Sequence, residues 1–426
     1  MSTYILFLGI FLSVLIRAFF VINGANVADI KLLFGMGDAV LKGLNPYVSL
    51  TYNSYPPLAV FIEALTILLS NISNIPFHIL TKIWPTLADI IITLLLYKFL
   101  IRLKVKPVFA SFWSLIFILN PISIIISSIH GQIDSLPSLL VLISVYLLSL
   151  SNKPKFRLSA LILGLAIAIK PNSLMLLPFF LIINKMSLRQ GFTFVLTCIT
   201  PLILIFAPFI LQNPQQILIR MLSYGGVYDF SYAAILRGFW YQQNAQTWLP
   251  QADQIFEASK VAFILGAIFL LVLLSQSKNL LKACLAVYLL FLGIYFGISA
   301  QYLSWILPLA ILAREKMVIP FSVAGTFALL GFYTFFGPDI LFGKFWHGAA
   351  FQNKYMLIYF LGNLLLWLTT LWWLVNIIKN YMYTSSKTLG QLHKKIIILS
   401  LILFIISLVP ILHLSFVILS EAKITQ

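Results

Sequence analysis

The chain has 426 residues, of which 61% are hydrophobic and only 9% are charged. A soluble globular domain is about half apolar and about one quarter charged, so this composition excludes a water-soluble monomer. The formal net charge of +17 does not indicate a nucleic-acid-binding protein, because the basic residues form short clusters between long apolar runs. We therefore expect an all-α protein that crosses a membrane many times.

The apolar runs predict thirteen membrane-spanning helices. A spanning helix needs about 20 mostly apolar residues, and these runs are too long and continuous for the strands of a membrane barrel. The first run lacks the small-residue cleavage site of a signal peptide, so we expect a retained helix. We expect a single transmembrane domain over residues 1–426. The expected spans are 4–22, 78–101, 108–129, 135–150, 158–169, 173–184, 191–210, 259–275, 283–299, 303–313, 317–336, 355–378 and 396–419.

The apolar segment 57–70 decides which side of the membrane each loop faces. Its helix would be about 21 Å long, too short to span, so we expect a re-entrant or interfacial helix that begins at Pro56 and Pro57. With this choice seventeen basic residues and one acid fall on one side, which the positive-inside rule makes cytoplasmic. The N-terminus is then inside and the C-terminus outside, and the long outer segments are 23–77, 211–258 and 337–354.

The first outer segment carries two acids, Asp29 and Asp38, on a stretch of helical periodicity that ends at Gly43. Nine residues apart on a helix, the two carboxylates point in opposite directions, so at most one faces a shared site. Asp29 follows the first span most closely, at the membrane surface, where a carboxylate could act as general base on a hydroxyl. The competing interpretations are a solvated loop acid or a helix N-cap.

A second polar group follows the span that ends at residue 129, with His130, Gln132 and Asp134 close together. Asp134 could simply cap the next helix. His130 and Gln132 fall at the outer mouth of the bundle, where polar side chains commonly line a substrate path, although an interfacial histidine is often only hydrogen-bonded. Asp89, within the second span, would cost roughly 2.5–3.5 kcal/mol at mid-bilayer. We therefore expect Asp89 to face the bundle, find a donor and have a structural role.

Lys170 lies between two unusually short apolar segments, 158–169 and 173–184. A break in a helix exposes backbone N–H groups, and together with a lysine these suit an anionic phosphate. An ion pair with Asp134, or snorkelling of a helix-end lysine, would explain the same residue.

Two further spans are joined by a segment that contains Gln301, Tyr302 and Trp305. Tyrosine and tryptophan at this depth belong by default to the interfacial aromatic belt. The sequence holds no glycine-rich phosphate loop and no Gly-x-Ser-x-Gly motif. Its five histidines are spread along the chain, so no structural metal site is predicted.

Taken in order, these segments resemble the GT-C membrane glycosyltransferases. The nearest likenesses are the first-mannose transferase of GPI-anchor synthesis and the bacterial mannosyltransferases that use polyprenyl-phosphate mannose. The resemblance covers roughly residues 25–310. It is carried by Asp29 with Gly43-Leu-Asn-Pro-Tyr47 and Tyr55-Pro-Pro-Leu58, Asp89 with Tyr97-Lys98, Gly131-Gln-Ile-Asp-Ser135, Lys170 before Leu177-Pro178, and Gln301-Tyr-Leu-Ser-Trp305 before Pro308.

The resemblance implies an inverting enzyme of the plasma membrane that transfers a sugar, mannose, from a polyprenyl-phosphate donor to a lipid-linked or glycan acceptor on the outer face. It implies Asp29 as the general base and Lys170 as the cation for the departing phosphate. Position 27 is Val, where the GPI branch has the first acid of an Asp-x-Asp pair, so we expect no metal cofactor. The other substrate-binding candidates are His130, Gln132, Asp134, Gln301, Tyr302, Trp305, Asp38 and His347.

Two other functions are compatible with the sequence. A lipid or solute transporter, or a flippase, would also have broken helices and buried ionisable residues. A non-catalytic scaffold within a membrane complex predicts no outward-facing cavity that holds these residues. Under all three hypotheses the expected partners include membrane lipids and exclude nucleic acid.

Overall fold

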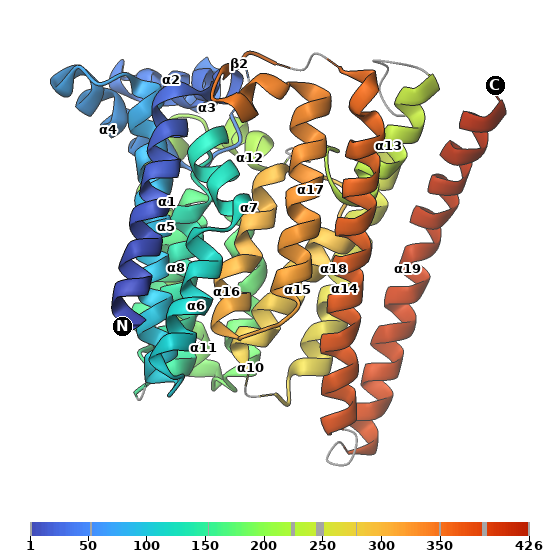
Figure 1. Ribbon diagram of the computed structural model, residues 1–426. Helices are drawn as coiled ribbons and strands as arrows, with labels where there is room; N and C mark the ends of the chain where they lie inside the picture. The colour runs from blue at the N-terminus through green and yellow to red at the C-terminus, as the bar shows by residue number, and fades with distance from the viewer. Residues whose placement is uncertain are drawn as a thin grey trace.

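The computed structural model describes residues 2–51, 53–151, 153–222, 226–243, 251–277, 279–348, 351–385 and 390–424. The described chain is a bundle of helices (Figure 1). Its strands are two short segments, β1 (Ala25–Asn26) and β2 (Phe345–Trp346), which pair in parallel. The expected all-α membrane bundle is therefore confirmed.

Seven helices in the described part of the chain are long and apolar enough to cross a membrane. A bent pair adds an eighth crossing if its two arms, which meet at 43°, form one span. This pair is α6 (Pro107–Ile118) followed by α7 (Pro121–Ile124) and η1 (Ile125–His130). The seven are α1 (Ser2–Asn23), α5 (Phe77–Arg102), α11 (Leu188–Ile210), α14 (Ala252–Leu274), α17 (Val318–Phe336), α18 (Met356–Ser385) and α19 (Gln391–Ile424).

The remaining expected spans coincide with shorter apolar helices of 10–17 residues. Because a straight spanning helix needs about 20 residues, helix length supports seven or eight crossings and does not establish thirteen. The shorter helices are α8 (Ser135–Val145) continued by η2 (Tyr146–Leu150), α9 (Phe156–Ile169), η3 (Pro171–Leu176) with α10 (Leu177–Ile183), α15 (Leu280–Ile294), and η4 (Ala300–Trp305) with α16 (Ile306–Leu312).

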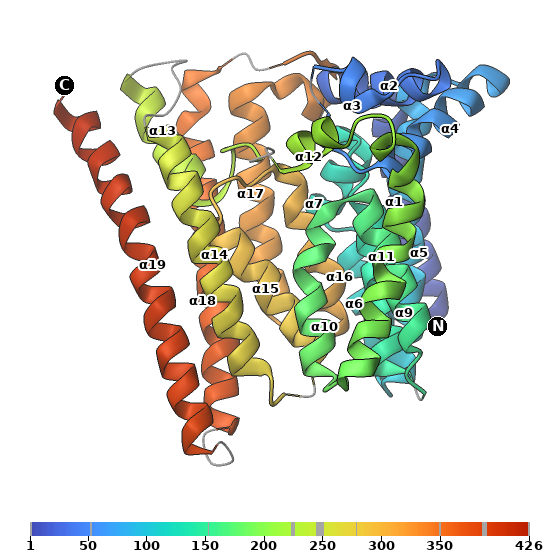
Figure 2. The ribbon, with the colours of Figure 1, turned by 180° about the vertical axis from the view of Figure 1, so that it is seen from behind.

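One end of the bundle, which we call the α2 end, is covered by short helices. They include α2 (Val27–Leu41), α3 (Pro46–Ser49), α4 (Pro57–Ser73) and α12 (Pro214–Leu222). Figures 1 and 2 show α2, α3 and α4 lying across this end and not along the bundle, in agreement with the expectation that segment 57–70 does not span. The helix α4 begins at Pro57 as expected and runs three residues further, to a left-handed C-cap at Asn74.

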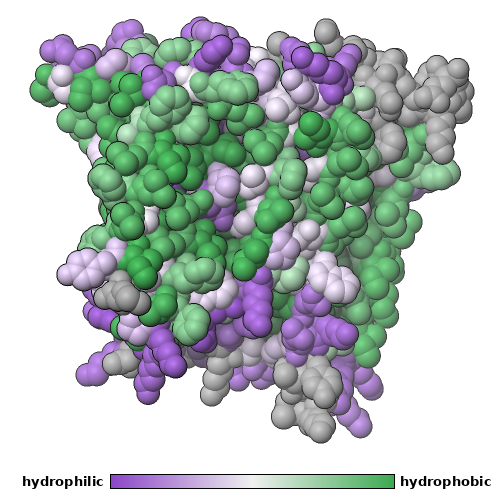
Figure 3. Space-filling view, in the orientation of Figure 1, coloured by the Kyte–Doolittle hydropathy of each residue, from purple (hydrophilic) through white to green (hydrophobic). Residues whose placement is uncertain are grey.

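The chain begins and ends at opposite ends of the bundle (Figure 1). Figure 3 shows an apolar band around the middle of one face, with hydrophilic residues gathered at the two ends. Exposed apolar side chains such as Leu8, Leu204 and Phe416 contribute to the lipid-facing surface. The described chain also includes α13 (Ser231–Gln243), η5 (Pro338–Phe342) and η6 (Asn353–Tyr355).

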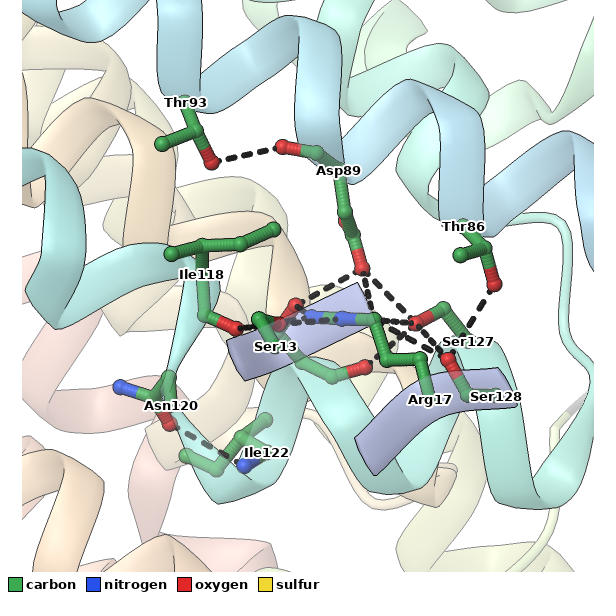
Figure 4. Close-up of polar contacts among 11 residues, drawn as sticks. Ser13, Arg17, Thr86, Asp89, Thr93, Ile118, Asn120, Ile122, Ser127 and Ser128 are labelled. Atoms are coloured by element: carbon green, nitrogen blue, oxygen red, sulfur yellow. Dashed lines mark hydrogen bonds and ion pairs between the residues drawn. The ribbon is translucent and has the colours of Figure 1, made fainter. Parts of the chain in front are cut away.

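A buried ion pair joins the first two long helices. Arg17 of α1 and Asp89 of α5 are both buried, and the guanidinium Nη1 lies 2.8 Å from Asp89 Oδ2 (Figure 4). The expectation that Asp89 faces the bundle and finds a donor is therefore confirmed. The other acceptors of Arg17, at 2.6–3.1 Å, are the hydroxyls of Ser13, Ser123, Ser127 and Ser128 and the carbonyl of Ile118.

Two of these serines also contact the carboxylate. The hydroxyls of Ser123 and Ser127 donate to Asp89 Oδ2 at 2.8 and 2.7 Å. Arg17 thus neutralises Asp89 while its N–H groups tie α1 to α5 and to the bent α6–η1 segment. The sequence analysis did not predict this arginine as the partner, although it lies within the first expected span.

We expect substitution of either charged partner to destabilise the bundle strongly. Asp89→Asn leaves the guanidinium unpaired and Arg17→Met leaves the carboxylate unpaired, each at a cost of about 3–5 kcal/mol. The double variant should lose less than the sum of the two, because no buried charge remains. Unfolding in detergent micelles measures the effect, with Ser13→Ala as the control that removes a neutral hydroxyl. Equal stability of wild type and Asp89→Asn would contradict this role.

Candidate functional site

A polar cavity of about 320 Å³ lies at the α2 end of the bundle. Segments far apart in the sequence form its wall: the start of α2, the loop after η1, the start of η4 and the turn around β2. The lining residues of this cavity that carry polar groups are Asn26, Asp29, Ser54, Tyr55, His130, Gln132, Asp229, Arg237, Ser299, Gln301 and Trp346. The cavity therefore contains several of the residues that the sequence analysis selected.

The carboxylate of Asp29 is the centre of a hydrogen-bond cluster in this cavity. His130 Nε2 lies 2.6 Å and Gln132 Nε2 2.8 Å from Asp29 Oδ2, and Asn26 Nδ2 donates to the same oxygen at 3.2 Å. The Asp29 side chain is still 36% exposed. Within the described residues Oδ1 accepts no hydrogen bond, so this oxygen is available to a molecule in the cavity.

The proton positions around His130 follow from its neighbours. An ionised Asp29 can only accept, so His130 Nε2 carries the proton that bridges the 2.6 Å contact. In a neutral imidazole Nδ1 is then an acceptor, and it lies 2.5 Å from the hydroxyl of Tyr333, which donates to it. Tyr333 thereby selects the tautomer of His130 that stabilises the Asp29 carboxylate.

These contacts set the acidity of Asp29. Burial alone would raise the pKa of the carboxyl, but the hydrogen bonds from His130 and Gln132 and the electrostatic interactions with His130 and Lys170 outweigh burial. The net result is a pKa below the ordinary value of an aspartate. Asp29 is therefore ionised at neutral pH and can accept a proton.

Local sequence explains why Asp29 stands where it does. Asn26 is the N-cap of α2, and its side-chain oxygen accepts from the backbone N–H groups of Ala28 and Asp29. Asp29 is therefore an acid in the first turn of a helix, a favourable position in the field of the helix dipole. Gly37 allows α2 to approach α4 closely, because a Cβ there would lie 2.7 Å from the backbone of Ala64.

A turn after η1 brings the two main partners of Asp29 to the same carboxylate. Gly131 adopts φ 90°, a left-handed conformation that glycine tolerates without cost, and it separates His130 from Gln132. A Cβ at Gly131 would also lie 3.0 Å from the side chain of Lys82. Glycine at this position thus serves both the turn and the close packing beneath it.

The buried side chain of Lys82 joins the two segments that hold the site. Its Nζ donates to the carbonyl oxygens of Phe20, Gly24 and Ser128, at the C-terminal ends of α1 and η1. A cation is favoured at helix C-termini, where carbonyl groups lack partners within the helix. Asn26 follows Gly24 by two residues, and His130 follows Ser128 by two residues. Lys82 therefore positions both segments that contact Asp29.

A second cavity, of about 230 Å³, adjoins the first. Lys170 lines it, and its Nζ lies 2.5 Å from Asp134 Oδ2, while the indole Nε1 of Trp305 donates to Asp134 Oδ1 at 2.6 Å. The interpretation of Lys170 as an ion-pair partner of Asp134 is thus confirmed. Asp134 makes no side-chain capping hydrogen bond to α8, so the capping interpretation is wrong.

The lysine in this second cavity is surrounded by aromatic rings. Its Nζ lies 5.7 Å from the ring centre of Tyr55 and 5.8 Å from that of Tyr302, within the range of cation–π attraction. Tyr302 stacks on Trp305 with ring centres 4.3 Å apart. The positive charge is therefore held in a fixed position at the wall of a cavity.

The two cavities share part of their walls. Ser54, Tyr55 and Gln301 line both, and Tyr55 donates its hydroxyl proton to Gln132 Oε1 at 3.0 Å. Tyr55 thus contacts the Asp29 cluster with its hydroxyl and faces Lys170 with its ring. The arrangement places a carboxylate that can accept a proton beside a fixed cation, with a polar wall between them.

Two selected residues lie elsewhere. Asp38 forms an exposed ion pair with Lys42 at 2.6 Å, one turn along α2, and lines neither cavity. The geometry expected from its nine-residue separation from Asp29 accounts for this. His347 is exposed and also lines neither cavity, whereas its neighbours Trp346 and Gly348 line the first one. Alternate residues of an extended chain face opposite sides, so Trp346 faces the cavity and His347 faces away from it.

The structure also brings in residues that the sequence analysis did not select. Asn26 stands directly before a helical segment, and this N-cap signal could have identified it. Tyr333 lies inside an apolar span, where no local pattern distinguishes it from a lipid-facing tyrosine. Asp229 and Arg237 form an ion pair in the wall of the first cavity.

Across the described ranges, no group of three or more His, Cys, Asp or Glu side chains could hold a metal ion. The groups nearest to Asp29 are amides and an imidazole that it already uses as hydrogen-bond donors.

Comparison with known proteins adds no family to this geometry, because no family model matches the chain and no curated protein is significantly similar to it. Fold and site together define a membrane-embedded helical protein with two adjoining polar cavities at one end of its bundle.

Lys82→Met is expected to destabilise the protein and to make the two segments that Lys82 joins more mobile. The variant keeps an apolar stem but leaves buried carbonyl oxygens unpaired, at about 1–3 kcal/mol for each. Unfolding in detergent should show this loss, and amide hydrogen exchange should accelerate in residues 24–30 and 128–132. The control is Lys42→Met, which removes an exposed lysine of α2 and should change stability by less than about 0.5 kcal/mol. Unchanged exchange in Lys82→Met would show that Lys82 does not hold these segments.

Proposed function

We propose that this protein is a membrane glycosyltransferase that moves a sugar from a polyprenyl-phosphate donor to a hydroxyl acceptor. The observation that supports this function best is the pair of cavities that meet at Tyr55 and Gln301. One cavity holds Asp29, a partly exposed carboxylate with a lowered pKa, and the other holds Lys170, a fixed cation. Sugar transfer from a phosphate donor needs these two groups on either side of the reacting carbon.

The reaction follows from the chemistry of the two groups. Asp29 accepts the proton of the acceptor hydroxyl as its oxygen forms a bond to the anomeric carbon. The bond from that carbon to the phosphate oxygen breaks on the opposite side, and the departing polyprenyl phosphate takes the electron pair. Lys170 stabilises the charge that develops on this phosphate. A single in-line displacement of this kind inverts the anomeric centre.

Other polar groups of the site would orient the substrates. An ionised Lys170 has three N–H donors, of which Asp134 takes one, so the ion pair holds the lysine in position without using all its donors. Gln301 lines both cavities and can contact donor and acceptor alike. Tyr302 and Trp305 offer ring faces beside the cation, where the sugar or the first isoprene unit of the donor would pack.

The substrate class and orientation rest on the resemblance to GT-C enzymes and on charge placement. We infer mannose as the sugar, a lipid-linked or glycan acceptor, and a topology of thirteen crossings in which five are made by the shorter helices. With this topology the positive-inside rule assigns the α2 end to the outer face of the plasma membrane. Asp29 and Lys170 would then meet a donor that is presented on the outer surface.

A transporter or flippase is the alternative, and it would need ionisable groups exposed to a path through the bundle. The Arg17–Asp89 pair lies within the spans but is buried and surrounded by hydroxyl partners. The pair is therefore not exposed to a path through the bundle, which makes transfer chemistry at the α2 end the better proposal.

Asp29→Asn should abolish transfer. An amide cannot accept the proton of the acceptor hydroxyl, and loss of a general base lowers the rate by about 10²–10⁴-fold. The assay supplies purified protein with dolichyl- or undecaprenyl-phosphate mannose and lipid-glycan acceptors, and detects the product by mass spectrometry. Asp38→Asn, which changes an exposed acid on the same helix, is the matched control and should keep wild-type turnover. Wild-type turnover in Asp29→Asn would refute the assignment of the base.

The pH dependence of transfer should report the hydrogen bonds of Asp29. The base works in its ionised form, so activity is lost as pH falls through its pKa, which lies below the ordinary value of about 3.9. His130→Ala removes the closest donor, raises this pKa and should move the acid limb of kcat/KM to higher pH. His347→Ala, at an exposed histidine, should leave the limb unchanged. An acid limb that stays in place in His130→Ala would mean that His130 does not stabilise the ionised base.

A further inference from the structure

A third cavity, of about 510 Å³, lies at the opposite end of the bundle from Asp29. It is bordered by the start of α15, the turn between α16 and α17, and the C-terminal half of α18. Figures 1 and 2 show these segments at the end of the bundle where the chain begins. This cavity has no part in the chemistry proposed for the α2 end.

The charges around this third cavity are unbalanced. Lys282, Arg314 and Lys316 line it together with one acid, Glu315. Glu315 pairs with Lys282 at 2.8 Å. Neither Arg314 nor Lys316 forms an ion pair with another described residue, so the cavity wall carries an excess of positive charge.

A buried donor in the same wall needs an acceptor. Trp373 is fully buried, lines the cavity, and its indole Nε1 has no hydrogen-bond partner among the described residues. An unsatisfied buried N–H is costly and therefore rare in folded proteins. Asn376 lines the cavity three residues further along α18, which puts its amide on the same face of the helix.

The positive-inside rule accounts for basic residues at this end but not for the rest of the arrangement. Topology requires only that lysine and arginine lie in the loops. It requires neither a cavity nor, in the wall of that cavity, a tryptophan whose buried indole N–H lacks an acceptor. Together, a guanidinium, an ammonium, an indole N–H and an amide supply several donors and two unpaired positive charges to one space.

We propose that this cavity binds a phosphate group. A phosphate carries negative charge and several acceptor oxygens, which match the guanidinium of Arg314, the ammonium of Lys316 and the indole N–H of Trp373. Its volume lies within the range of sites for small ligands, and basic pockets between membrane helices commonly bind anionic headgroups. The phosphate belongs to a membrane lipid or to a soluble molecule, and the same residues would hold either.

The test measures retained lipid in nanodiscs that contain phosphatidylcholine and a graded fraction of phosphatidylglycerol. Native mass spectrometry of the full-length protein counts each lipid that stays bound. Wild type should retain phosphatidylglycerol in preference to phosphatidylcholine. The double variant Arg314→Gln, Lys316→Gln should weaken this retention about tenfold or more, because two charge-assisted hydrogen bonds are lost.

Two single variants separate a built site from general attraction of charge. Trp373→Phe keeps the ring that packs on Phe321 but removes the N–H, and it should weaken binding about threefold to tenfold. Lys379→Gln, at an exposed lysine of α18 outside the cavity wall, should change binding by less than about twofold. Equal melting temperatures verify that each variant is folded.

A titration with inorganic phosphate identifies the source of the phosphate. If phosphate binds in phosphatidylcholine nanodiscs with the same dependence on the variants and displaces phosphatidylglycerol, the site serves a soluble phosphate. If only phosphatidylglycerol binds in this way, the site serves a lipid. The proposal is overturned if wild type shows no preference for either phosphate probe over phosphatidylcholine. It is also overturned if Trp373→Phe binds like wild type, or if Lys379→Gln weakens binding as much as the double variant.

Discussion

A charge buried in a membrane bundle has to find its partners within the protein, because the hydrocarbon region offers no water to replace them. Arg17 meets this requirement with Asp89 and with hydroxyl and carbonyl oxygens from α1 and the bent α6–η1 segment. These oxygens can surround one guanidinium only if α1, α5 and the bent segment meet at one depth. The ion pair therefore sets the register of the helices that it joins.

Lys82 is also a buried basic group that needs partners within the protein, and its partners lie beside the site. This lysine lies seven residues before Asp89 on α5, so the two side chains share a face of the helix and are separated by about 10 Å along its axis. Lys82 completes its coordination with carbonyl groups at the ends of α1 and η1, immediately before Asn26 and His130. Burial of charge within the bundle thus determines where the donors to Asp29 lie. The Asp29 carboxylate at the α2 end is therefore positioned by lysine and arginine groups beneath it.

Several properties of the protein could be predicted because they depend on local sequence. Hydropathy alone indicates a helical membrane bundle, and the length of segment 57–70 alone excludes it as a straight span. The cost of an acid in lipid predicts that Asp89 finds a donor, and helix periodicity predicts that Asp29 and Asp38 diverge. The break at Lys170 allowed an ion pair with Asp134 among its alternatives. The number of crossings could not be read in this way, since the shorter helices are apolar yet below the usual spanning length.

What the sequence by itself determined is the class of fold, the segments that meet lipid and the residues whose burial demands a partner. Tertiary structure decided which partner each one has: Arg17 for Asp89, three backbone carbonyls for Lys82, and His130 and Gln132 for Asp29. It also excluded His347 from the site and added Tyr333. The physical reason is that hydropathy and helical period are properties of neighbouring residues, whereas a hydrogen bond between residues far apart in the chain exists only after their helices have packed.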